Sequence, residues 1–121
     1  MGPFRTFEAL DRDTSWILRA AAVAGGTFEL DLVARVLHLP VPAVREAVAR
    51  AAAAGLAVAL TSDGRAEMAP DVVRAILVAT APSLRARYNE RIAELLAEPD
   101  PRRAALHLDK ATAYRSARAA A

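Results

Sequence analysis

The spacing of the apolar residues changes once along the middle of the chain, from a helical period to a period of two. A first group recurs at helical spacing and comprises Phe28, Leu32, Val33, Val36 and Leu37. After the short break at residues 38–40, a second group with the same spacing comprises Val41, Val44, Val48 and Ala52. The pattern predicts two short helices joined by a tight turn.

Beyond the second predicted helix the alternation becomes that of a strand. Gly55 stands where a residue with left-handed backbone would end the helix, and Leu56, Val58 and Leu60 then alternate with smaller or polar residues. Residues 62–65, Ser-Asp-Gly-Arg, contain the Asp-Gly pair that hairpin turns prefer, so residues 66–68 are expected to pair back as a second strand. Helix, turn, helix and hairpin in this order predict a winged helix-turn-helix.

The N-terminal part is expected to support this unit. Weak periodicity over residues 1–10 predicts a lead-in segment, whose Phe4 and Phe7 would pack on the domain. A helix is predicted from Asp11, where Asp11 or Asp13 can accept hydrogen bonds from the first turn, to the glycine pair at 25–26. Its apolar stripe comprises Ile17, Ala20, Ala21 and Ala24, with Trp16 in core packing at the flank. This helix would cover the back of the two-helix unit, which cannot enclose its own apolar faces.

Further helices are predicted after the hairpin. One starts at Pro70, and an amphipathic one carries Leu84, Tyr88, Ile92, Leu95 and Leu96. The two prolines in residues 97–101 end the latter. Residues 102–109, with Leu106 and Leu108 inward, and residues 111–121 are expected to form two last helices. Their apolar side has no predicted partner, as at the start of a helical repeat array.

The predicted fold class is therefore mainly α, a winged helix-turn-helix with a short β-hairpin and additional C-terminal helices. The predicted organisation is a lead-in at 1–10, a winged helix-turn-helix domain at 11–97 and C-terminal helices at 102–121. A length of 121 residues suits one compact domain with a tail. Hydrophobic residues make up 55% of the chain, mostly as alanine, which favours helices around a modest core.

Composition excludes several kinds of site. The chain has no cysteine, so neither a disulfide framework nor a zinc-finger set is expected. With His38 and His107 as the only histidines, a histidine metal cluster is also excluded, and no cofactor is predicted. The absence of a long apolar run and of a signal-like opening predicts a cytoplasmic protein without a membrane partner.

The candidate nucleic-acid-binding residues are Arg45, Arg50 and Arg65. A DNA-binding winged helix lays its second helix in the major groove and offers several donors there. Here that helix offers two arginines and the opposing Glu46 on an alanine background, and Arg65 lies at the tip of the predicted wing. A formal net charge of +2 is too small to indicate nucleic-acid binding by itself. These arginines are therefore interpreted mainly as parts of a solvated face.

No catalytic set is evident. His107 lies beside leucines without a nucleophile or carboxylate partner and is expected to pack, while Ser15 and Ser83 lack a Gly-x-Ser-x-Gly setting. The chain contains no Gly-x-x-x-x-Gly-Lys-Ser/Thr phosphate loop. We therefore expect a protein that is not an enzyme.

The order of these segments resembles the winged-helix segment that follows the nucleotide-binding domain in STAND-type ATPases, especially the large bacterial LuxR-family transcriptional regulators. The matching segments are 18–23 with Gly25 and Phe28, then 30–33, Leu39, 44–48, 54–56, 71–74 and 85–96. Residues 105–108, followed by Tyr114 and Ala117, are similar to the start of the helical repeats in those proteins.

The resemblance implies a regulatory or interaction module of a transcriptional regulator, which couples a nucleotide-binding domain to helical repeats. In many relatives a histidine of the winged helix faces the nucleotide, but Pro70 stands at the matching position, so no site residue is carried over. The implied partners are neighbouring regulator domains or another protein. The alternative is a stand-alone, dimeric DNA-binding transcription factor, and the oligomeric state is left open.

Overall fold

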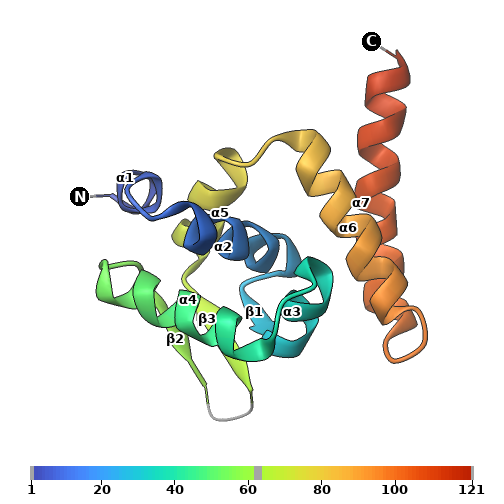
Figure 1. The fold of residues 1–121 in the computed structure, drawn as a ribbon. Helices are drawn as coiled ribbons and strands as arrows, with labels where there is room; N and C mark the ends of the chain where they lie inside the picture. Colours follow the sequence, from blue (N-terminus) through green and yellow to red (C-terminus); the bar gives the residue numbers. More distant parts are fainter. Residues whose placement is uncertain (1, 62–63, 121) are drawn as a thin grey trace. The chain divides into compact units, whose positions relative to one another are not determined.

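The computed structural model describes residues 2–61 and 64–120, and within them the fold is mainly helical with a small three-stranded antiparallel sheet (Figure 1). In chain order the elements are α1 (Pro3–Glu8), α2 (Arg12–Ala24), β1 (Thr27–Glu29), α3 (Leu30–Leu37), α4 (Val41–Ala53), β2 (Val58–Leu60), β3 (Arg65–Met68), α5 (Pro70–Val78), α6 (Pro82–Leu96) and α7 (Pro101–Ala120). Contacts group them into two compact units, Met1–Ala79 and Thr80–Ala121, so that α6 belongs with α7. The predicted boundaries at 1–10, 11–97 and 102–121 stay predictions.

The central helix of the first unit is α2, which packs against α3, α4 and α5. Of the two predicted capping residues, Asp11 caps the helix, because its carboxylate accepts hydrogen bonds from the Thr14 backbone N–H at 3.1 Å and from the Thr14 hydroxyl at 2.6 Å. These bonds favour the charged carboxylate and lower the pKa of Asp11. Its buried face includes Leu18 and Ala21, neither of which exposes any surface.

The strand β1 was not predicted, and the assignment of Phe28 to a helix is wrong. Phe28 lies in β1 with Ala66 of β3 as its partner, and the sheet order is β1-β3-β2. A three-residue strand is too short to show a period of two. It is held instead by backbone bonds at both ends, from Met68 N–H to the Gly26 carbonyl at 2.7 Å and from Leu30 N–H to the Gly64 carbonyl at 3.0 Å.

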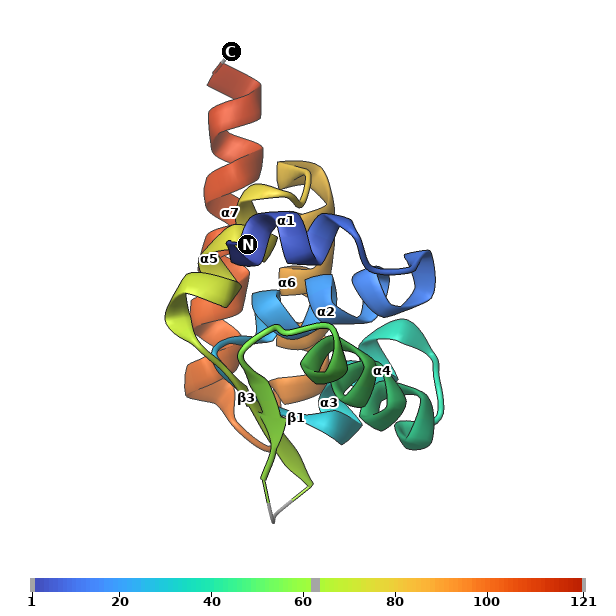
Figure 2. The ribbon, with the colours of Figure 1, turned by 90° about the vertical axis from the view of Figure 1, so that its left-hand side faces the viewer.

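The predicted hairpin is confirmed. Strands β2 and β3 are antiparallel, with Val58 opposite Met68 and Leu60 opposite Ala66. Val58, Ala66 and Met68 are buried, whereas Leu60 is 43% exposed. In Figures 1 and 2 the hairpin extends away from the helices of its unit. The predicted turn at Ser62 and Asp63 lies outside the described residues.

Two helices of the first unit end in the same way. After α4, Gly55 adopts a φ of +102°, its N–H donates to the Ala52 carbonyl, and Leu56 N–H donates to the Ala51 carbonyl. After α3, the same bond pattern is built on His38, whose φ is +56° and ψ +45°. The predicted glycine cap is confirmed, and His38 is a non-glycine residue in left-handed backbone.

Replacing His38 with glycine is expected to raise the free energy of unfolding by up to about 1 kcal/mol, because glycine adopts left-handed backbone without steric cost. Chemical denaturation followed through Trp16, the only tryptophan of the chain, measures this effect. The matched change Ala49→Gly, at an exposed position inside α4, should instead lower stability by about 1 kcal/mol. Equal losses in both variants would contradict the assigned backbone of His38.

Two expectations at the N-terminus need correction. The lead-in forms the helix α1, which packs against α5 and buries Phe7, while Phe4 stays 42% exposed. Trp16 is 40% exposed and not a core residue. Trp16 lies in the first turns of α2, on the side opposite the buried stripe. Its hydrophobic side chain suggested core packing, but its position on the helix directs it away from the core. The helix predicted to start at Pro70 is α5, which packs against α2.

The second unit is a pair of packed helices, α6 and α7. The predicted break between 109 and 111 is wrong, because α7 runs without interruption from Pro101 to Ala120. Its buried positions are Ala104, His107 and Ala111, whereas Leu106 and Leu108 are 61% and 50% exposed. Alanine fits the close approach of two helices, and α6 provides the partner whose absence was expected.

Candidate functional site

The exposed surface of α4 has alanine and proline at its centre and arginine at its edges. At 3.6 residues per turn, Arg45 and Arg50 point about 140° apart around the helix. The arc between them is occupied by Pro42, Ala49, Ala53 and Glu46, all exposed. Pro42, Ala49 and Ala53 have no side-chain donor or acceptor, and Glu46 has only acceptors and pairs with Arg50, so the middle of this face offers little to base edges.

Arg50 already interacts with acidic groups. Its Nη2 lies 3.4 Å from Oε1 of Glu46, one turn earlier, with both side chains more than half exposed. Its charge also contributes to the lowered pKa of Asp11, after the hydrogen bonds from Thr14. An exposed pair of this kind contributes only about 0.3–0.5 kcal/mol to stability, but it reduces the net positive charge at this edge of α4.

Arg65 is exposed at the start of β3, where acidic residues flank it. In the sheet register Arg65 lies opposite Glu29, and Glu67 follows two residues later on the same strand. Its backbone carbonyl accepts hydrogen bonds from the Thr61 N–H at 2.8 Å and the Thr61 hydroxyl at 3.1 Å, which closes the end of the ladder. The three predicted arginines are therefore all exposed, but two of them stand among carboxylates.

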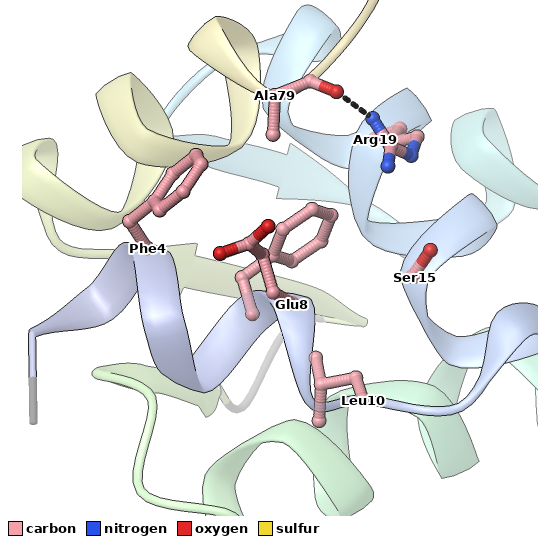
Figure 3. A pocket seen from close by; sticks show the side chains of 7 residues that line it. Phe4, Glu8, Leu10, Ser15, Arg19 and Ala79 are labelled. Atoms are coloured by element: carbon pink, nitrogen blue, oxygen red, sulfur yellow. Dashed lines mark hydrogen bonds between the residues drawn. The ribbon is translucent and has the colours of Figure 1, made fainter.

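A pocket of about 330 Å³ lies in the first unit between α1, the first turns of α2 and the residue after α5 (Figure 3). The Arg19 guanidinium donates a hydrogen bond to the Ala79 carbonyl at the C-terminal end of α5, and its central carbon lies 5.1 Å from the centre of the Phe7 ring. Sequence reasoning missed this pocket, since α1 was not expected to be a helix.

A buried polar pair in the second unit connects α6 to α7. Oδ1 of Asn89 accepts a hydrogen bond from Nδ1 of His107 at 2.7 Å, and both residues are under 10% exposed. Burial, with smaller contributions from Lys110 and Arg103, lowers the pKa of His107 to about 4. The prediction that His107 packs is confirmed, and its partner is an amide, which neither accepts a proton nor acts as a nucleophile.

Apolar side chains line a groove of about 440 Å³ along the second unit, which includes Ala97, Ala104 and Leu108. The two carboxylates on its border have partners, since Glu90 pairs with Arg115 and Glu94 with Arg91. The groove therefore presents mainly apolar surface.

Residues 2–61 and 64–120 contain neither a metal-binding cluster nor a membrane-spanning helix. No group of three or more His, Cys, Asp or Glu side chains is arranged there to hold a metal ion. None of the described helices combines the length and apolar character that crossing a membrane requires.

Comparison with known proteins adds no assignment. No family model, no curated protein sequence and no solved structure matches the chain.

Proposed function

We propose that residues 11–97 include a winged helix-turn-helix that acts as an interaction module of a cytoplasmic regulator and binds other domains or a protein partner. The order α2, β1, α3, α4, β2, β3, with β3 in the middle of the sheet, supports the winged-helix assignment. In this arrangement α4 is the helix that a DNA-binding relative would place in the major groove.

The composition of the exposed α4 surface carries the proposal. Base reading requires donors and acceptors in the middle of the inserted helix, but that region consists of Pro42, Ala49 and Ala53 with Glu46, whose carboxylate pairs with Arg50. Short apolar side chains permit close approach of another protein surface. Leu39, just before α4, and Leu60, on the hairpin, are further exposed apolar side chains of the same segment, at 38% and 43% exposure. This face therefore suits a protein partner better than a duplex.

DNA binding by the arginines is the competing function, and a charge-removal series separates the two. Under our proposal, replacing Arg45, Arg50 and Arg65 together with glutamine weakens binding to a random-sequence duplex no more than the removal of three arginines elsewhere does, because non-specific binding depends on total charge and not on these positions. Fluorescence anisotropy at several salt concentrations measures both the affinity and its salt dependence.

The matched control replaces Arg87, Arg102 and Arg118, three exposed arginines of the second unit, and so removes the same charge elsewhere. A DNA-binding protein would lose more than about tenfold in affinity through the first triple change and not through the second, with the salt slope reduced by about two to three. That outcome would favour the stand-alone transcription factor.

A further inference from the structure

The pocket of the first unit has the size and lining of a small-molecule site. Its volume of about 330 Å³ falls at the lower end of the range for such sites. Both aromatic and charged side chains face it, and six residues that line it are Phe4, Phe7, Glu8, Leu10, Ser15 and Arg19. The surface is therefore divided between apolar area and a small number of polar groups, as in sites that orient a ligand.

A carboxylate lies on one side of the pocket. Glu8 is the last residue of α1 and is exposed, and within the described residues its side chain makes no hydrogen bond or ion pair. Figure 3 shows the Glu8 carboxylate between Phe4 and Arg19, on the side of Phe4. A carboxylate beside an aromatic ring is a favourable environment for an ammonium group, which both groups attract.

A carboxylate-binding group lies on the other side. Arg19 is held in place by its bond to the Ala79 carbonyl and by the Phe7 ring. A guanidinium carries five N–H groups in a planar fork, a geometry that matches carboxylates. The Ser15 hydroxyl lies one helical turn before Arg19 and points into the same region in Figure 3. A hydroxyl and a guanidinium can hold the same carboxylate.

Opposite charges at the two sides restrict the ligand. A cation is attracted by Glu8 but repelled by Arg19, and an anion is attracted by Arg19 but repelled by Glu8. A zwitterion can place each of its charges beside the group of opposite sign. From this arrangement we propose that the pocket binds a free α-amino acid with an apolar side chain. Its ammonium would pair with Glu8, its carboxylate with Arg19 and Ser15, and its side chain would lie against Phe4 and Leu10. This site is independent of the α4 face, so either proposal can fail alone.

Titration of the whole chain with three matched probes tests the proposal. L-leucine carries both charges, 3-methylbutylamine lacks the carboxylate, and 4-methylpentanoate lacks the ammonium. Calorimetry, or amide NMR shifts in α1 and α2, should show leucine binding at least about tenfold more tightly than either single-charge probe. Glu8→Gln should weaken leucine binding by about tenfold and leave or improve binding of 4-methylpentanoate. Ser15→Ala should weaken leucine and 4-methylpentanoate together.

The matched control is Glu67→Gln, which removes an exposed carboxylate from β3, away from the pocket, and should leave leucine binding unchanged. Circular dichroism of each variant verifies that the fold is retained. The proposal is overturned by any of three results. These are no saturable binding of leucine up to about 10 mM, leucine affinity no higher than that of the single-charge probes, or equal effects of Glu8→Gln and Glu67→Gln.

Discussion

Replacing Phe28 with alanine is expected to lower the free energy of unfolding of the first unit by about 3–5 kcal/mol. Phe28 is 1% exposed and lies in β1 opposite Ala66, so truncation leaves a cavity where the sheet meets the helices. The alanine partner cannot fill this space. Denaturation followed through Trp16 fluorescence measures the loss, because that residue belongs to the same unit.

The matched variant is Phe4→Ala, which removes the same ring from a position that is 42% exposed. Its expected cost is below about 1–2 kcal/mol, since much of the ring is already in water. Equal costs at the two positions would show that β1 is not packed as described.

Acidification from pH 7 to pH 4 is expected to destabilise the second unit by up to about 3 kcal/mol through His107. Its pKa is about 4 in the folded state, against 6.5 for the unfolded chain. Between these values the unfolded chain binds a proton and the folded chain does not. The stabilisation is therefore complete above pH 6.5, falls as the pH decreases, and is lost near pH 4.

Urea denaturation followed through NMR signals of α6 and α7 at several pH values measures this dependence. His107→Gln should flatten the curve between pH 6.5 and 4, because glutamine can donate to Asn89 without titrating. The control His38→Asn removes the exposed histidine of the first unit and should leave the curve of the second unit unchanged. An unchanged curve in His107→Gln would mean that another group causes the pH dependence.

The elements predicted correctly are those that a local sequence pattern marks, such as a capping residue or regular apolar spacing. Asp11 caps α2 by a local bond, and Gly55 ends α4 because few other residues adopt its backbone. The hairpin followed from alternation over several residues, and α5 and α6 from apolar spacing after Pro70 and Pro82.

The elements that were missed depend on distant partners. β1 is three residues long and exists because β3 pairs with it, which no local pattern reveals. In α7 the leucines at 106 and 108 suggested an inward face, but His107 and the alanines around it face α6. His107 makes a buried hydrogen bond with Asn89, which lies 18 residues earlier, and local spacing does not reveal such a contact.

The residues of the candidate sites also divide into those that a local pattern predicts and those that depend on distant contacts. The exposure of Arg45, Arg50 and Arg65 followed from helical and strand periodicity. The pocket did not, because it requires α1 to fold onto α5 and Arg19 to reach the Ala79 carbonyl, sixty residues away. Contacts over such separations depend on tertiary structure that periodicity does not encode.

Selection from a random duplex DNA library by the whole chain tests the central claim, that the α4 face binds protein and does not read bases. We predict that no sequence is enriched over repeated rounds and that any binding is lost to unlabelled competitor. Enrichment of one sequence, bound tightly in the presence of competitor and abolished by the Arg45, Arg50 and Arg65 triple change, would contradict the claim.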